Sequence, residues 1–443
     1  MINPIEIDTL LEARWIIPVE PSETVLQDHA IAINNGVINA ILPITEAQSR
    51  FNPHERIVLD EHVLIPGLIN LHTHAAMSLM RGLADDLPLM EWLNKHIWPT
   101  ENHHVAPSFV FDGTRLACAE MLKGGITCFN DMYLFPEAGA EAVLASGMRA
   151  ALGMIAIDFP TAYASDADDY LAKGLALRDK FRQHTLLSFC FAPHAPYTVS
   201  DKTFTNILTY AEQLDLPIHT HLHETSDEIK LSLETCGKRP IERLHQLGLL
   251  SPNLIAVHMV HLTDDEIRLI SQQDCSVAHC PSSNMKLASG FAPITSLLNQ
   301  GINVGLGTDG AASNNRLDIF AEMRLAALLA KAESNQADVL PAHQALRMAT
   351  LNGANALGLG DITGSLVIGK VADITAVDFS DFELSPCYDP ISHLVYTAGR
   401  EHVSHVWVSG RILLNDKQLT TLDQFELKQR TAFWRERIQE TDK

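Results

Sequence analysis

Short apolar runs alternate with helix-length segments through most of this chain, from about residue 66 to about residue 360. Each run has the length of a buried strand, and the segments between them have helical spacing, as at 108–123 and 317–331. Strands alternating with helices over about 300 residues predict a (β/α)8 TIM barrel of the α/β class. A doubly wound open sheet is the alternative, but no GxGxxG motif follows an early strand. The eight predicted strands are 64–71, 127–131, 149–155, 186–192, 217–221, 254–258, 275–279 and 304–309.

The two ends of the chain have a different pattern, with short segments typical of antiparallel strands. Asn35 and Gly36 lie between two alternating apolar segments, which predicts a hairpin because both central residues of a type I′ turn need a positive φ. Similar segments recur at 372–378 and 403–414. Neither end has enough strands for its own sheet, so we expect both ends to form one small β-sandwich domain. The predicted division is 1–63 and 361–443 for this domain, 64–360 for the barrel, and a polar amphipathic helix at 422–439.

Composition and charge narrow the classes of partner. Hydrophobic residues make up 46% of the 443 and charged residues 19%, which is typical of a folded globular protein. The formal charge of −22 disfavours nucleic acid and anionic membrane surfaces as partners. Seven cysteines without a CxxC pair indicate reduced thiols, and residues 1–8 lack the features of an export signal. We therefore expect a cytoplasmic protein with a small-molecule substrate, and a homo-oligomer is compatible with its size.

Side chains that bind metals or transfer protons end nearly every predicted barrel strand. His72 and His74 are the most specific, because residues i and i+2 of a strand point to the same face. Asp309 ends the last strand between Gly307 and Gly310, which let the backbone approach closely, and it is the leading acidic ligand. Imidazoles suit zinc and other transition metals, and strand ends of a barrel meet on one face, so we predict a metal-dependent active site there. The strand-end residues are His72, His74, Asp131, His194, His219, His221, His258, His279 and Asp309.

Spacing alone leaves several assignments open. His219, His221 and His223 share one face for as long as their strand continues, so the third histidine ligand is undecided among them. Glu224 follows this cluster directly, and Glu101 follows an apolar and proline-containing stretch. Other polar residues are interpreted as exposed or structural: the helical Glu322 and Glu333, and His54, His62, His96, His184, His343 and His393, which fall away from strand ends.

Four motifs contain most of these residues: PGLINLHTH at 66–74, HLHE at 221–224, HCPSSNMKL at 279–287 and GTDG at 307–310. Together they resemble the amidohydrolase superfamily, and more closely its 5-methylthioadenosine/S-adenosylhomocysteine deaminase group, beside the chlorohydrolases and guanine deaminases. The resemblance implies one divalent metal ion per subunit, with zinc favoured over Fe²⁺ or another transition metal. The fourth strand lacks the lysine that bridges two metals in other members. The implied ligands are His72, His74, His221 and Asp309, with His223 turned away.

The same resemblance implies a hydrolytic deaminase that acts on an adenine nucleoside and releases ammonia. Glu224 is implied to protonate a ring nitrogen of the substrate. His258 and Asp309 are implied to orient the attacking water and to accept its proton. The small zinc deaminases share this logic but carry HxE and PCxxC motifs, which this chain lacks.

The resemblance also assigns the substrate pocket. Glu101 is implied to bind the ribose hydroxyls, His194 to contact the nucleoside, and Trp98 and Leu83 to form apolar walls. Some relatives place an arginine after the third strand, where this chain has residues 153–155 (GMI). 5′-Methylthioadenosine or adenosine is therefore favoured over S-adenosylhomocysteine. The alternatives are deamination of guanine, 8-oxoguanine, cytosine or a triazine, and an inactive barrel used for assembly.

Overall fold

The computed structural model describes residues 4–441 and contains the predicted barrel. Each barrel strand pairs in parallel with the next one along the chain. The barrel is nearly closed, because the amide of Asp309 donates to the carbonyl of His72 at 3.0 Å and so joins the last strand end to the first. The (β/α)8 prediction is confirmed. The strands are β5 (Leu68–Thr73), β6 (Ile126–Asp131), β7 (Arg149–Ala156), β8 (Leu187–Pro193), β9 (Ile218–Leu222), β10 (Leu254–His258), β11 (Ser276–His279) and β12 (Asn303–Leu306).

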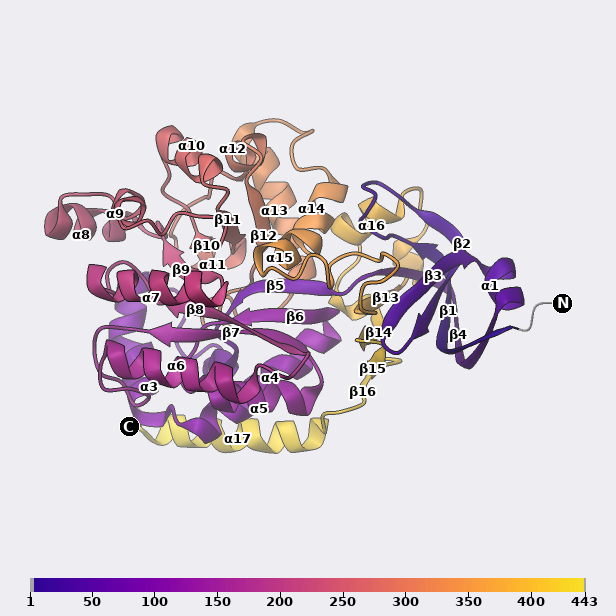
Figure 1. The fold of residues 1–443 in the computed structure, drawn as a ribbon, viewed down its shortest axis with the longest axis horizontal. Helices are drawn as coiled ribbons and strands as arrows, with labels where there is room; N and C mark the ends of the chain where they lie inside the picture. The colour runs from indigo at the N-terminus through magenta and orange to yellow at the C-terminus, as the bar shows by residue number, and fades with distance from the viewer. Residues whose placement is uncertain (1–3, 442–443) are drawn as a thin grey trace.

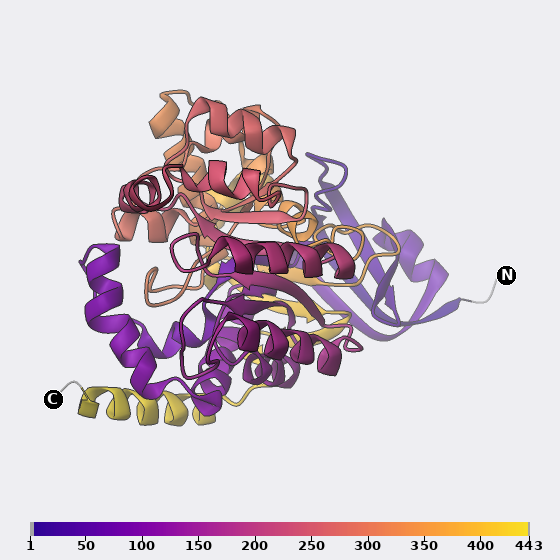
Figure 2. The same cartoon turned by 60° about the vertical axis from the view of Figure 1, so that its left-hand side comes forward.

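Helices cover the outside of the barrel, as Figures 1 and 2 show from two directions. Several begin where a side chain caps the first turn, as Thr225 and Thr263 do by accepting hydrogen bonds from the backbone. The helices that follow the strands include α4 (Pro107–Lys123), α5 (Pro136–Ser146), α6 (Ala167–Phe181), α7 (Asp201–Leu214), α8 (Ser226–Cys236), α10 (Asp264–Gln272), α12 (Ile294–Asn299) and α13 (Ile319–Ser334). Shorter helices are α1 (Ile44–Arg50), α2 (Leu89–Trp92), α3 (Trp98–His104), α9 (Pro240–Gln246), α11 (Pro281–Lys286), α14 (Ala342–Met348), α15 (Leu351–Ala356) and α16 (Pro390–Tyr396).

A second sheet is built from both chain ends and lies beside the barrel, on the right in Figure 1. The hairpin is confirmed, since Asn35 and Gly36 have φ values of 52° and 74° between β2 and β3. The predicted union of the two chain ends is confirmed as well, and all eight strands form one hydrogen-bonded sheet. The boundaries at residues 63 and 360 stay predictions, and residues 1–3 lie outside the described part. The strand order is β16 (Gln418–Leu419), β15 (Arg411–Asn415), β14 (Val403–Val408), β13 (Ile374–Asp378), β4 (Phe51–Pro66), β1 (Ile5–Ile16), β2 (Leu26–Asn34) and β3 (Val37–Pro43).

The apolar run 64–71 is two strands rather than the one predicted. Its first residues end β4, and its last residues belong to β5 in the barrel. The chain passes between the sheets at Gly67, whose amide donates to the carbonyl of Asp373 at 2.9 Å. A Cβ atom at this position would lie 2.1 Å from Oγ1 of Thr127, so only glycine fits. Apart from Asn70 the run has no polar side chain, because both strands are buried.

Ion pairs attach the other elements to the barrel. Nε of Arg149, at the start of β7, donates to Oδ2 of Asp373 at 2.9 Å between the two sheets. The predicted terminal helix is α17 (Gln424–Thr441), which packs on the outside of the barrel at the bottom of Figure 1. Its Arg430 and Trp434 both donate to Oδ2 of Asp112 on α4. No helix within residues 4–441 combines the length and the apolar character needed to cross a membrane.

Candidate active site

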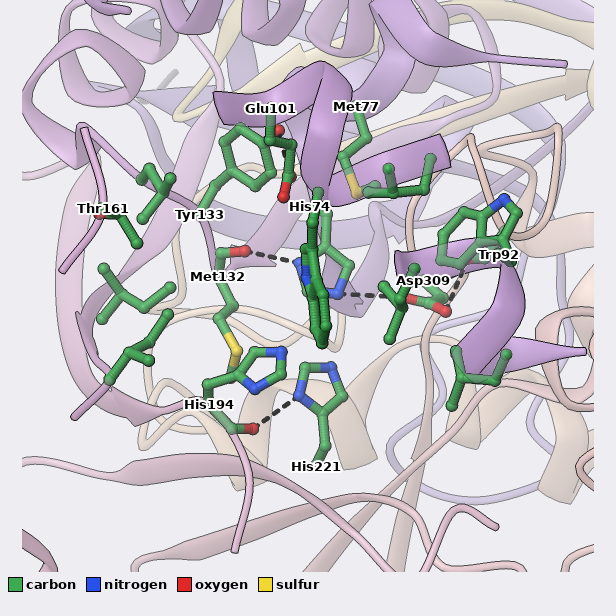
Figure 3. Close-up of a pocket in the computed structure, with 18 of the residues that line it drawn as sticks. His74, Met77, Trp92, Glu101, Met132, Tyr133, Thr161, His194, His221 and Asp309 are labelled. Atoms are coloured by element: carbon green, nitrogen blue, oxygen red, sulfur yellow. Dashed lines mark hydrogen bonds and ion pairs between the residues drawn. The ribbon is translucent and has the colours of Figure 1, made fainter. Parts of the chain in front are cut away.

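Three histidines and one aspartate meet at the carboxyl ends of three barrel strands. His72 lies in β5 and His74 directly follows it, His221 lies in β9, and Asp309 follows β12. One ring nitrogen or carboxylate oxygen of each residue lies within 4.8 Å of the others. Figure 3 shows His74, His221 and Asp309 facing one another at the floor of a pocket. The structure therefore brings together the four residues that the sequence analysis selected as metal ligands.

Hydrogen bonds hold each of these histidine rings with Nε2 turned toward the centre of the group. Every Nδ1 has a partner in the surrounding shell, and a ring whose Nδ1 donates keeps its lone pair on Nε2, which is the arrangement of a metal ligand. The partners are the carbonyl of Met132 for His74 at 2.6 Å, the carbonyl of His194 for His221 at 2.7 Å, and Nε2 of His219 for His72 at 2.9 Å.

The carboxylate of Asp309 has one oxygen fixed and one directed at the histidines. The hydroxyls of Ser283 and Ser313 donate to Oδ2 at 2.6 and 2.7 Å. Oδ1 lies 3.2 Å from Nε2 of both His72 and His74. Burial alone raises the pKa of Asp309, but its close contacts with the two histidines hold that pKa well below its usual value.

The donor set fits a divalent cation. Among the described residues, the buried Nε2 of His72 and Oδ1 of Asp309 have no partner of good hydrogen-bond geometry. Buried polar atoms are rarely left in this state, and a metal ion would satisfy both at once. Three imidazole nitrogens and a carboxylate oxygen are ligands that zinc and similar transition metals accept.

Glu224 and His258 form the next layer of the site. Oε2 of Glu224 lies 3.7 Å from Nε2 of His258, and both residues are buried. Burial raises the pKa of Glu224, although the nearby His258 partly offsets this effect. Nδ1 of His258 is 2.8 Å from Oδ1 of Asn284, which leaves Nε2 facing the site. His258 and Asp309 both have left-handed backbones, with φ of 74° and 61°, which is a strained conformation often found at functional sites.

A pocket of about 350 Å³ opens above these residues. Oε1 of Glu101, on α3, accepts a hydrogen bond from the hydroxyl of Tyr133 at 2.7 Å, and burial raises the pKa of this carboxyl. Burial lowers the pKa of His194 to about 3, so its ring is neutral. Trp98 also lines the pocket, but Leu83 does not, so the prediction for Leu83 is wrong. The apolar lining includes Met77, Leu89, Trp92, Leu93, Ile97, Ile155, Ile157 and Phe159.

Comparison with known proteins assigns the family. The family model described as "Amidohydrolase family" matches residues 63–413. The chain belongs to the amidohydrolase family. It is 48% identical over 438 residues to a 5-methylthioadenosine/S-adenosylhomocysteine deaminase of Teredinibacter turnerae, and the match covers 99% of each protein.

Solved structures of other proteins resemble this amidohydrolase over nearly its whole length. An adenosine deaminase from Xanthomonas campestris with bound zinc is 49% identical, with a TM-score of 0.98 over 99% of this chain and 100% of that one. An atrazine chlorohydrolase from Arthrobacter aurescens, complexed with zinc, is 25% identical, with a TM-score of 0.89 over 96% of this chain and 99% of that one.

The three clustered histidines, whose roles spacing left undecided, take different positions in the structure. β9 ends at Leu222, and the left-handed φ of 55° at His223 turns that ring away from the site. Nδ1 of His223 is 3.0 Å from the carbonyl of His261, and its Nε2 accepts from the amide of Ile241. His219 lies behind His72 as its hydrogen-bond partner. The prediction that His223 turns away is confirmed.

Two further strand-end residues lie outside the pocket. Oδ1 of Asp131 accepts hydrogen bonds from the amide of Ala75 at 2.7 Å and from the hydroxyl of Thr73 at 3.0 Å, so it fixes the loop after β5. His279, at the end of β11, is buried and is absent from the pocket lining. Burial lowers its pKa to about 3.

The interpretation of Glu322 as a solvent-exposed helical residue is wrong. Its side chain is only 1% exposed. Its carboxylate accepts hydrogen bonds from the amide of Ser282 at 3.0 Å and from Nδ2 of Asn314 at 2.8 Å. It thereby connects the first turn of α11 and the loop that follows β12 to the first turn of α13. Glu333, at the other end of the same helix, is exposed as predicted.

Several residues that support the site were not singled out from the sequence. Glu228 is buried in the first turn of α8, where its carboxylate binds the backbone next to Glu224. Tyr133 and Tyr197 line the pocket. The only sequence signal for Glu228 is its place three residues after the capping Thr225, which is a pattern that usually marks a helix start and nothing more.

Proposed function

We propose that this amidohydrolase is a metal-dependent deaminase of adenine nucleosides that prefers 5′-methylthioadenosine. The observation that carries the proposal is the buried group of His72, His74, His221 and Asp309, open to a pocket that also contains Glu224. The names of the relatives support the choice of reaction, since both the 48% identical protein and the 49% identical structure are named deaminases.

We propose that these four residues hold one zinc-class ion. When bound, such an ion lowers the pKa of a water molecule from about 15.7 to about 7 and so supplies a nucleophile at neutral pH. The end of β8 supports a single ion, because it consists of Ala192 and Pro193 and carries no lysine that could bridge a second one.

The residues around the group supply the proton transfers. The raised pKa of Glu224 favours its protonated form, which would donate to a ring nitrogen as water adds to the amine-bearing carbon. Nε2 of His258 and the carboxylate of Asp309 face the same space and would accept the proton of that water. A proton then passes to the amine nitrogen, the carbon–nitrogen bond breaks, and ammonia leaves. The product is the corresponding inosine-type nucleoside.

The pocket chemistry favours a nucleoside with a neutral 5′ group. Glu101 would bind the ribose hydroxyls, while His194 and Trp98 would contact the nucleoside. No lysine or arginine is among the lining residues in the described part of the chain, and the wall at the end of β7 is formed by Ile155, Ile157 and Phe159. An apolar wall accommodates a methylthio group but leaves the charged amino-acid end of S-adenosylhomocysteine without a partner.

Ammonia release from a panel of substrates tests this proposal. The zinc-loaded protein is given 5′-methylthioadenosine, adenosine, S-adenosylhomocysteine, guanine and a triazine, at equal concentrations. We expect kcat/KM to be greatest for 5′-methylthioadenosine and at least about tenfold lower for S-adenosylhomocysteine, because about 1.4 kcal/mol of lost interaction corresponds to that factor. Chelation should abolish turnover and added zinc should restore it. Fastest release from guanine or a triazine, or no release from any compound, contradicts the proposal.

A further inference from the structure

Glu228 makes an unusual pair of contacts at the start of α8. Its two carboxylate oxygens accept hydrogen bonds from the amides of His223 at 2.9 Å and Glu224 at 2.8 Å. In an ordinary capping box the glutamate accepts from the amide of the capping residue itself, as Glu266 does from Thr263 at 2.8 Å. Glu228 instead reaches back beyond its own capping residue to the peptide that carries Glu224.

These contacts fix the backbone where the chain leaves β9 and turns into the site. His223 has a left-handed φ of 55°, a conformation that costs a residue with a side chain of the order of 1 kcal/mol or more. Two hydrogen bonds to successive amides hold the chain in this turn. The direction in which the side chain of Glu224 leaves the backbone is therefore set by Glu228.

The side chain of Glu224 has few other restraints. Its Oε1 has one long contact of 3.5 Å with the hydroxyl of Ser289, and its Oε2 lies 3.7 Å from Nε2 of His258. Glu228 is itself only 6% exposed. Burying a carboxylate is unfavourable unless its hydrogen bonds are good, so its presence at this place indicates a role in holding these two amides.

We propose that Glu228 is a positioning residue for the deamination: it fixes the peptide between His223 and Glu224, so that the Glu224 carboxyl is aimed at the ring nitrogen of the substrate. This inference rests on the proposed function. Glu228 does not touch the substrate, and it lines neither the pocket nor the metal group among the described residues. Its effect should therefore appear in the chemical step, with substrate and metal binding left intact.

The test compares Glu228→Gln with the wild type in ammonia release from 5′-methylthioadenosine. A glutamine has one acceptor oxygen, so it can satisfy only one of the two amides. We expect kcat to fall about 10–100-fold, as for other residues that orient a reacting group, with KM within about threefold and the zinc content unchanged. Glu12→Gln is the matched control, because Glu12 is equally buried and hydrogen-bonded by Arg56 in the other sheet. It should lower Tm without changing kcat.

A double variant separates positioning from a general structural effect. If Glu228 acts through Glu224, then Glu224→Gln combined with Glu228→Gln should be no slower than Glu224→Gln alone. Glu228→Asp, which keeps the charge on a shorter side chain, should have an intermediate kcat and serves if the glutamine variant does not fold.

The proposal is overturned if Glu228→Gln turns over at the wild-type rate, if its effect multiplies with that of Glu224→Gln, or if it acts by losing zinc. If the wild type releases no ammonia from any nucleoside, the proposed function fails and the proposal fails with it. A wild type that is active beside an unaffected Glu228→Gln contradicts only the role of Glu228.

Discussion

Glu322 should make the stability of the protein depend on pH in a way that a single substitution removes. Burial raises the pKa of its carboxyl from 4.5 to about 7, although hydrogen bonds from Ser282 and Asn314 lower it in part. The folded state therefore holds this proton more tightly than the unfolded state. The resulting loss of stability is absent below pH 4.5, grows as pH rises toward 7 and is constant above that.

The size of the effect follows from this pKa difference. A shift of about 2.5 units corresponds to about 3 kcal/mol of unfolding free energy. For a chain of 443 residues, the unfolding entropy is about 0.9 kcal/mol/K at Tm, so about 3 kcal/mol shifts Tm by about 3 °C. The Tm of Glu322→Gln minus the Tm of the wild type should therefore be about 3 °C greater at pH 8 than at pH 5. The pH-independent cost of the substitution, roughly 1–3 kcal/mol for the hydrogen bond that glutamine cannot accept, cancels in this comparison.

Thermal unfolding of the metal-free proteins at the two pH values measures this difference, because metal binding itself varies with pH. Glu212→Gln is the control, since Glu212 is exposed on α7. The control should keep the same Tm difference from the wild type at both pH values. A difference between Glu322→Gln and the wild type that stays constant within about 1 °C would refute the buried, proton-binding state assigned to Glu322.

Three further substitutions test the site, the connection between the sheets and the pocket wall. Ser313→Ala removes one of the two hydroxyls that donate to Oδ2 of Asp309. Zinc affinity, measured by competition with a chelator, should therefore fall about 10–100-fold. An unchanged affinity would argue against Asp309 as a ligand. Gly67→Ala places a methyl group against Thr127, so Tm should fall, and Thr127→Gly in the same chain should recover part of the loss. Phe159→Arg adds a cation to the pocket wall, so the ratio of kcat/KM for S-adenosylhomocysteine to that for 5′-methylthioadenosine should rise. A constant ratio would show that this wall does not contact the 5′ group of the substrate.

The sequence predicted the barrel and the positions of His72, His74 and Asp309 because these depend on local pattern, whereas the choice of His221 among three histidines came from the family resemblance. Each buried strand is a short apolar run, and the two-residue period of a strand makes His72 and His74 neighbours. The ends of parallel strands meet at one face, which brings His221 and Asp309 to the same point. The seven cysteines are free, and five of them are buried, as expected for reduced thiols in the described structure.

The errors arose where tertiary contacts decide exposure or direction. Glu322 has the polar character of a solvent-facing helical residue, and it is buried because α11 and the loop after β12 pack against the first turn of α13. The run 64–71 is apolar on both sides of Gly67, so hydropathy cannot show that the chain changes sheets there. Glu228 lies three residues after the capping Thr225, which is the usual spacing at a helix start. The hydrogen bond that it accepts from the amide of Glu224 depends on the turn at His223, which the sequence does not show.

The most direct test of the proposed chemistry is the rate of ammonia release from 5′-methylthioadenosine by Glu224→Gln, measured beside the wild type at equal zinc content. Glutamine keeps the shape of the side chain but cannot donate an acidic proton to the ring nitrogen. The account predicts unchanged zinc binding and a kcat at least about 100-fold lower than that of the wild type. Turnover near the wild-type rate would contradict it.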